Sequence, residues 1–146
     1  HVRSRRQRQM CIETGAKQAL LWHPALFRLK HHIEQLVGHP FNSCLANLYE
    51  NGNQAVGWHS DDEPSLRSPQ QENVVIASLS FGATRKFCFK HKFKPEKIEL
   101  MLHSGQLIVM RGQTQRYWKH ALMKSSKITE PRLNLTFRYF YPTLQR

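Results

Sequence analysis

The segment from Arg132 to Arg138, read Arg-Leu-Asn-Leu-Thr-Phe-Arg, alternates strictly between polar and apolar side chains. Successive side chains of a β-strand point to opposite faces, so this period of two predicts a strand with two different faces. Its apolar face must pack against a second sheet or a helix. Its polar face would carry both arginines into the mouth of a barrel, where buried cations need anionic partners.

The rest of the chain from residue 41 onwards has the same short-strand character. Turn signals rich in Gly, Asn and Pro separate the segments, for example Asn51-Gly52. We predict strands over residues 41–50, 54–59, 74–81, 85–91, 98–103, 106–110, 116–121 and 132–141. Polar loops are expected over residues 64–73 and 124–131. This pattern predicts a mainly β fold with a double-stranded β-helix core, of the jelly-roll kind.

One amphipathic helix is predicted ahead of these strands, over residues 24–37. Pro24 is tolerated in a first helical turn, and Gly38 is a typical terminator. The apolar residues that repeat at helical spacing are Leu26, Leu29, Ile33, Leu36 and Val37. We expect this stripe to pack on one sheet. Residues 1–22 are interpreted as a basic arm or an irregular strand pair, and residues 23–146 as the main domain. Because the chain starts at His1 without Met, we interpret it as a fragment whose upstream sequence is missing.

The chain is strongly basic, with a net charge of +12 from 22 Lys and Arg against 10 Asp and Glu. This charge favours a polyanionic partner, most commonly nucleic acid, over a merely solubilising surface, because the cations are clustered. We expect phosphate contacts at Arg3, Arg5, Arg6, Arg8, Arg85, Lys90 and Lys92. The acidic residues gather instead at Asp61, Asp62 and Glu63.

The cysteines and the hydropathy pattern bear on the compartment. The chain has three cysteines, an odd number, and they are widely spaced, at Cys11, Cys44 and Cys88. This pattern favours free thiols in a reducing compartment over disulfides or a zinc finger. No apolar run approaches the roughly 20 residues of a membrane span. We therefore expect a protein with no membrane partner, located in the cytoplasm or, in a eukaryote, the nucleus. We also expect a monomer.

A candidate metal site combines His59-Ser60-Asp61 with His120 further along the chain. Two imidazoles and one carboxylate on one side of an ion leave other positions open, as in the facial triad of non-haem Fe(II) oxygenases. A His-x-Asp sequence alone occurs often by chance. Taken alone, His59 would more often be an ordinary polar residue than a metal ligand, and Asp61 would more often belong to a turn or a helix cap. The arginines at 132 and 138 favour the metal site, since a small dianion such as a dicarboxylate would satisfy both. Asn47 and Tyr49 share a strand face and could bind the same ligand.

These residues together resemble the AlkB family of Fe(II)/2-oxoglutarate-dependent dioxygenases, which remove alkyl groups from nucleic-acid bases. The resemblance covers about residues 41–142. Its motifs are His59-x-Asp61-Asp62-Glu63, His120, Asn47-Leu48-Tyr49, the run from Ile76 to Ala83, and the run from Pro131 to Arg138. Members with Asp-Asp-Glu after the first His, which act on N1-methyladenine and N3-methylcytosine, are the most similar branch.

The resemblance implies a role for each site residue. His59, Asp61 and His120 would hold Fe(II), and Arg132 would pair with the distal carboxylate of 2-oxoglutarate. Asn47, Tyr49, Ser78 and Asn134 would complete that pocket, with Arg138 near Asp61 and the keto-acid carboxylate. Glu63 would face the damaged base, and Asp62 would orient nearby basic or loop residues. The implied reaction consumes O2 and releases formaldehyde, succinate and CO2, as direct-reversal repair of alkylated DNA or RNA.

The N-terminal region departs from the family pattern. Members usually carry aromatic residues in a lid that recognises the flipped nucleotide, and residues 1–21 contain no Phe, Tyr or Trp. Residues 1–22 would then be a partial lid. Either the aromatic contact lies in missing upstream sequence, or Trp22, Trp58 or Met10 substitutes for it, although Trp58 should point away from His59. Two rival interpretations stay open: a related dioxygenase acting on a protein or small molecule, and a non-catalytic nucleic-acid-binding barrel.

Overall fold

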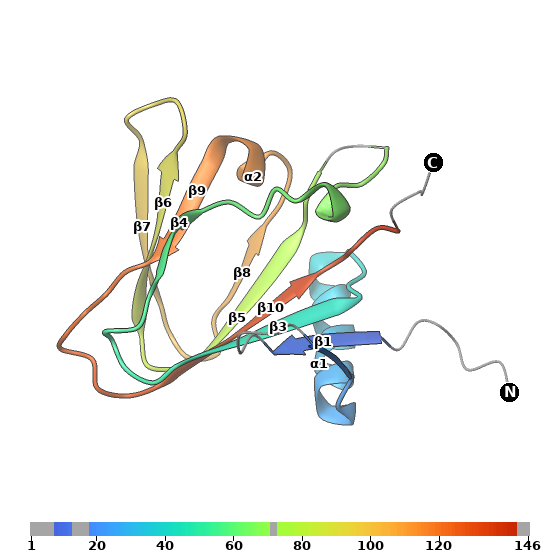
Figure 1. Cartoon of the computed structure of the whole chain (residues 1–146), viewed down its shortest axis with the longest axis horizontal. Helices are drawn as coiled ribbons and strands as arrows, with labels where there is room; N and C mark the ends of the chain where they lie inside the picture. Colours follow the sequence, from blue (N-terminus) through green and yellow to red (C-terminus); the bar gives the residue numbers. More distant parts are fainter. Residues whose placement is uncertain (1–7, 13–17, 71–72, 143–146) are drawn as a thin grey trace, which may run out of the picture.

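Two β-sheets that face each other make up most of the molecule (Figure 1). The structure is a computed structural model, and it describes residues 8–12, 18–70 and 73–142. The larger sheet has the strand order β2-β1-β3-β10-β5-β8, and the smaller sheet has the order β4-β9-β6-β7. The strands are β1 (Arg8–Ile12), β2 (Gln18–Leu21), β3 (Ser43–Tyr49), β4 (Val56–His59), β5 (Ile76–Gly82), β6 (Arg85–His91), β7 (Lys97–Leu102), β8 (Leu107–Met110), β9 (Trp118–Leu122) and β10 (Arg132–Arg138). The prediction of a mainly β fold is confirmed.

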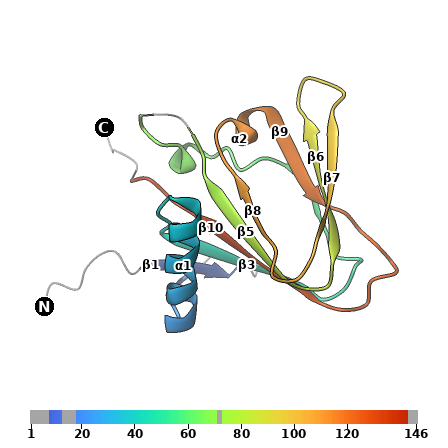
Figure 2. The same ribbon diagram turned by 180° about the vertical axis from the view of Figure 1, so that it is seen from behind.

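Helix α1 (Pro24–Val37) covers the face of the larger sheet that lies away from the smaller sheet, as Figure 2 shows. Its Ile33 and Val37 join the cluster of buried side chains that includes Leu135 and Phe137 of β10. The predicted helix, its bounds and its packing on a sheet are therefore confirmed. Leu36 is the exception, because it lies at the margin of the stripe and is 78% exposed.

Both ends of α1 are capped, and the predicted terminator Gly38 forms the second cap. His23 accepts a hydrogen bond at Nδ1 from the Ala25 N–H, which satisfies one of the free amides of the first turn. At the other end Gly38 adopts a φ of 71° and donates its N–H to the Glu34 carbonyl. That left-handed conformation is one that glycine adopts without strain, so the helix ends there.

The strands before α1 extend the larger sheet. β1 pairs in parallel with β3 and antiparallel with β2, with an irregularity between Arg8 and Met10. The strand-pair interpretation is thus confirmed for residues 8–12 and 18–21. Arg3, Arg5 and Arg6, expected to bind phosphate, lie outside the described residues, as does the side chain of Arg8. Among the described residues, no helix is long and apolar enough to cross a membrane.

Two predicted strands end or begin elsewhere for identifiable reasons. The segment predicted as a strand over 116–121 starts with one helical turn, α2 (Thr114–Tyr117), before β9 begins at Trp118. The last strand ends at Arg138, because beyond this residue the backbone of Phe140 is hydrogen-bonded by the Asn42 side chain and not by a neighbouring strand. The Asn42 amide donates to the Phe140 carbonyl at 2.9 Å and accepts from the Phe140 N–H at 2.8 Å. A single 3-10 turn, η1 (Pro64–Leu66), lies within the predicted loop 64–73.

Candidate metal centre and anion pocket

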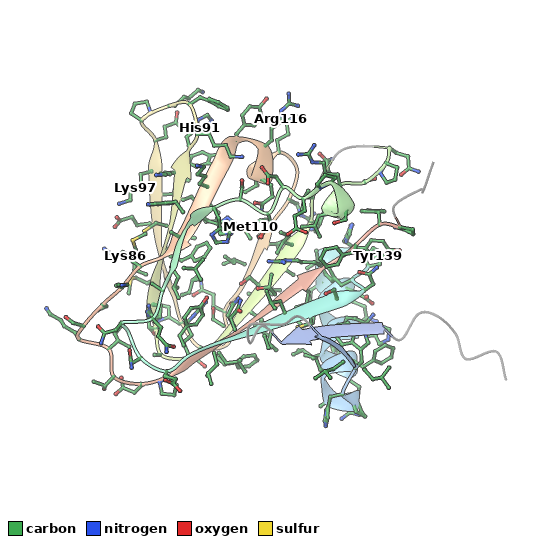
Figure 3. The ribbon with its side chains drawn as sticks, in the orientation of Figure 1. Lys86, His91, Lys97, Met110, Arg116 and Tyr139 are labelled. Carbon is green, nitrogen blue, oxygen red and sulfur yellow. The ribbon has the colours of Figure 1, made fainter. Side chains whose placement is uncertain are left out.

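A cavity of about 310 Å³ lies between the two sheets, and strands of both contribute to its lining. The polar face of β10 points into this cavity, with Arg132, Asn134, Thr136 and Arg138 all among the lining residues. The inward polar face predicted from the period of two is therefore confirmed. In Figure 3 the side chain of Met110, another lining residue, lies between the sheets.

The two histidines and Asp61 come together at the smaller sheet. His59 ends β4 and pairs with His120 on β9 in the sheet register, so their side chains lie side by side. Asp61 follows two residues after His59, and its Oδ2 lies 3.5 Å from Nε2 of His120. One potential ligand atom from each residue lies within 4.8 Å of the others. That spacing fits one metal ion between them.

The hydrogen bonds of this group favour metal binding. Nδ1 of His59 lies 2.7 Å from the Gly57 carbonyl, so this nitrogen donates and leaves the Nε2 lone pair for a ligand role. The ring of Phe87 stacks on His120 with centroids 5.5 Å apart, which fixes the plane of that imidazole. His120 is only 4% exposed. The donor set therefore fits a divalent ion that accepts nitrogen and oxygen ligands.

Asp61 is held as an ionised ligand. Burial alone would raise the pKa of this carboxyl, but its hydrogen bond with His120 and the nearby charge of Arg138 keep the pKa below its ordinary value. The Arg138 guanidinium donates to Asp61 Oδ1 at 3.1 Å, where the prediction placed this pair. The backbone N–H of Asp61 donates to Oε1 of Gln115 at 2.8 Å. Gln115 is a site residue that the sequence interpretation missed.

Arg132 occupies the other end of the cavity as a buried cation. It is 2% exposed, and it donates to the Ser80 hydroxyl at 2.9 Å and to Asn134 Oδ1 at 3.2 Å. Its Nε has no hydrogen-bond partner, and no carboxylate within the described part of the chain forms an ion pair with it. Burial lowers the pKa of Arg132, which is the expected effect of removing a cation from water. A buried guanidinium with an unused Nε–H donor and no carboxylate partner fits an anionic ligand.

The polar residues around Arg132 are fixed by one another. The Ser78 hydroxyl donates to Asn134 Oδ1 at 2.8 Å, and the Asn134 amide donates to the Thr136 hydroxyl at the same distance. The Tyr49 ring lies 5.6 Å from the Arg132 guanidinium, and Asn47 lines the same cavity. The structure therefore gathers all the residues expected to bind the cosubstrate, and adds Ser80 and Thr136.

Arg85 is a correction. It was predicted to contact phosphate, but it is 1% exposed, and its guanidinium donates to the carbonyls of Gln54 at 2.7 Å and Met123 at 2.8 Å. These bonds tie two loops together, so the cation is unavailable to nucleic acid. A signal was present in the sequence, because Arg85 shares the inward strand face with Phe87 and Phe89.

The remaining predicted residues lie at the rim of the site. Glu63 is exposed and lines the 310 Å³ cavity between the sheets, the metal-site cavity. Asp62 lies outside this cavity, with its carboxylate 3.6 Å from the Lys92 ammonium. Lys92 also donates to the Gln115 carbonyl at 2.8 Å, so this lysine is partly engaged within the protein. The Lys90 ammonium sits 4.6 Å from the centre of the Trp58 ring, on the outer face of the smaller sheet.

Comparisons with known proteins agree with this geometry. The family model described as the 2OG-Fe(II) oxygenase superfamily matches residues 5–138. Alpha-ketoglutarate-dependent dioxygenase alkB homolog 3 of Bos taurus is 49% identical over 131 residues, covering 83% of this chain and 44% of that protein. DNA oxidative demethylase ALKBH2 of Bos taurus is 38% identical over 135 residues, covering 86% of this chain and 46% of that protein.

A solved structure, that of OsALKBH1, shares the fold with a TM-score of 0.64 at 19% identity, covering 86% of this chain and 67% of that one. The chain spans less than half the length of the curated relatives named above. The matched region includes the metal-site residues and the arginines of β10. The chain belongs to the 2OG-Fe(II) oxygenase superfamily and, within it, to the AlkB family, whose cofactors are Fe(II) and 2-oxoglutarate.

Proposed function

We propose that this protein removes methyl groups oxidatively from alkylated nucleic-acid bases, with N1-methyladenine and N3-methylcytosine in DNA or RNA as substrates. The observation that carries the proposal is the presence of two sites in one 310 Å³ cavity: the cluster of His59, Asp61 and His120, and the buried cation Arg132, whose Nε has no hydrogen-bond partner. The naming of one relative as a DNA oxidative demethylase supports the choice of substrate class.

The chain's own residues would bind and orient the reactants. His59, Asp61 and His120 would hold Fe(II) on one side, and Arg132 would hold the distal carboxylate of 2-oxoglutarate. Arg138 would keep Asp61 ionised and aligned through its 3.1 Å hydrogen bond. Fe(II) with 2-oxoglutarate and O2 supplies the oxidation, with release of succinate and CO2. The packed walls of the cavity would exclude bulk water from this chemistry.

Glu63 is proposed to select the base. A base methylated on its pairing nitrogen carries positive charge, and Glu63 places a carboxylate at the mouth of the cavity. Such a lesion cannot pair normally, so flipping it out of the stack costs less than flipping an intact base. The methyl group leaves as formaldehyde, and the original base is restored.

The same reasoning extends to the architecture and setting. We propose that the strands β3-β10-β5-β8 and β4-β9-β6-β7 form the two walls of a double-stranded β-helix, supported by the cavity between them. Cys44 and Cys88 are buried free thiols, which fits a cytoplasmic or nuclear protein. We further propose that it acts as a monomer.

The test is incubation of the protein with Fe(II), 2-oxoglutarate and a panel of substrates, followed by mass spectrometry. The panel holds DNA and RNA oligonucleotides with N1-methyladenine or N3-methylcytosine, and a methylated peptide as the rival class. The proposal expects methyl loss only from oligonucleotides. Methyl loss from the peptide alone, or succinate formation with no change in any oligonucleotide, would overturn it.

A further inference from the structure

A second cavity, of about 360 Å³, lies beside the metal-site cavity. Gln115 forms part of the wall between them, because it lines the second cavity while its side chain accepts the N–H of Asp61. The acidic run divides between the two: Asp61 and Glu63 line the metal-site cavity, and Asp62 lines the second. A ligand in the second cavity would therefore be a neighbour of a base bound in the metal-site cavity.

The charged lining of the second cavity favours an anion. Arg67, Lys92 and Arg116 contribute three cations against the single carboxylate of Asp62. Lys92 donates to the Gln115 carbonyl and lies 3.6 Å from the Asp62 carboxylate, and Arg67 donates to the backbone carbonyl of Asp62 at 3.0 Å. A lysine has three N–H donors and an arginine five, so both keep donors for a phosphate group.

A cluster of aromatic rings stands beside these cations at the β6–β7 hairpin. His91 stacks on Tyr117 with an interplanar angle of 13° and meets Trp118 edge-on at 5.0 Å. Phe93 contacts the same Tyr117 ring at 6.4 Å between centroids. Figure 3 shows His91 and Arg116 at one end of the molecule, and the Arg116 guanidinium lies 5.4 Å from the Tyr117 ring.

Phe93 is held out into solvent at this hairpin. It is 76% exposed, although burying a phenyl ring is ordinarily favourable. The backbone N–H groups of Phe93 and Lys94 both donate to Nδ1 of His91, at 3.0 and 3.1 Å, which fixes the turn that presents the ring. A fixed, exposed ring beside free cationic donors is the combination that binds single-stranded nucleic acid, since rings stack with bases and cations hold the backbone.

We propose that the second cavity and the exposed ring of Phe93 form a subsite for the nucleotide adjacent to the target base in a single-stranded substrate. The phosphate would bind Lys92 and Arg116, and the adjacent base would stack on Phe93. A base inside a duplex keeps its own stacking neighbours, so the subsite favours single strands. This inference rests on the proposed function, because it assumes a nucleic-acid target in the metal-site cavity.

The stacking part is tested by a double-mutant cycle between protein and oligonucleotide. Binding is measured by fluorescence anisotropy without 2-oxoglutarate, using a single strand with a central N1-methyladenine and twins with an abasic site on its 5′ or 3′ side. We expect the unaltered protein to bind one abasic twin about tenfold more weakly than the intact strand. The Phe93→Ala variant should bind that twin and the intact strand with equal affinity. Leu36→Ala, which alters an equally exposed residue on α1, should retain the tenfold difference.

The phosphate part is tested by salt dependence on the same strand. Arg116→Gln should reduce the slope of log affinity against log salt by about 0.7, the value for one contact to a single strand. Arg28→Gln, at an exposed position on α1, should leave the slope unchanged. An undiminished abasic effect in Phe93→Ala, or an unchanged slope in Arg116→Gln, would overturn the subsite.

Activity on the same strands separates this inference from the proposed function. If the unaltered protein demethylates the lesion but shows no abasic effect at either position, the subsite fails and the proposed function stands. If no strand is demethylated while the abasic effect and its loss in Phe93→Ala are both seen, the proposed function fails and the subsite stands.

Discussion

Single residues set the chemistry, and the three proposed metal ligands are separable from the nucleic-acid contacts. His59, Asp61 and His120 line the cavity, whereas the cations at the hairpin lie outside it. We predict that His59→Ala or Asp61→Ala abolishes turnover and lowers Fe(II) affinity by at least tenfold. Oligonucleotide binding, measured by anisotropy, should change little. Loss of binding in parallel with turnover would contradict this separation of roles.

Arg132 allows a second prediction at this scale. Because its buried guanidinium has an unused Nε–H donor, replacing it should remove a charge-assisted contact worth about 2–5 kcal/mol. Arg132→Lys should raise the KM for 2-oxoglutarate at least tenfold, since an ammonium cannot reproduce bidentate geometry. The KM for the oligonucleotide should stay unchanged. An unchanged KM for 2-oxoglutarate would show that the cosubstrate carboxylate binds elsewhere.

At the scale of elements, Glu34 joins α1 to Phe41, in the segment just before β3. Its Oε1 accepts from the Phe41 N–H at 2.9 Å and from the buried Lys30 ammonium at 2.6 Å. We predict that Glu34→Ala lowers the free energy of unfolding by about 2–3 kcal/mol, because an amide and an ammonium both lose their acceptor. Urea unfolding measures this, with Gln35→Ala on the exposed face as the control. Equal stability of the two variants would contradict the link.

The same carboxyl predicts a pH dependence. Burial alone would raise the pKa of Glu34, but hydrogen bonds from Lys30 and the Phe41 N–H bring the pKa below its ordinary value. A carboxyl whose pKa is lower in the folded state stabilises the protein above its unfolded pKa and loses that contribution as the pH falls through the folded pKa. The stability difference between the unaltered protein and Glu34→Gln should therefore shrink in acid. A difference independent of pH would contradict an ionised Glu34.

Elements with a regular period were predictable from the sequence, and those that depend on distant partners were not. The strand β10 and the helix α1 repeat at 2 and 3.6 residues, so their inward faces followed directly. The turn of α2 spans only Thr114–Tyr117, too short to show a period. Gln115 belongs to the site because it meets Asp61, which is 54 residues away in the sequence. The strand face of Arg85 indicated a buried position, but its positive charge favoured the wrong prediction of a phosphate contact.

For the whole molecule, the net charge of +12 predicts strongly salt-dependent binding. Each phosphate contact to a single strand contributes about −0.7 to the slope of log affinity against log salt. We predict a slope more negative than about −2, since several exposed cations lie near the site. Anisotropy titrations at a series of salt concentrations measure it. A slope near zero would show that the charge serves another purpose.

The most direct test of the central claim measures succinate and formaldehyde together on one N1-methyladenine oligonucleotide and its unmethylated twin. With Fe(II) and 2-oxoglutarate present, the account predicts equal amounts of both products from the methylated strand. It predicts no formaldehyde from the twin, and neither product from Asp61→Ala. Succinate without formaldehyde on the methylated strand, or equal formaldehyde from the unaltered protein and Asp61→Ala, would contradict it.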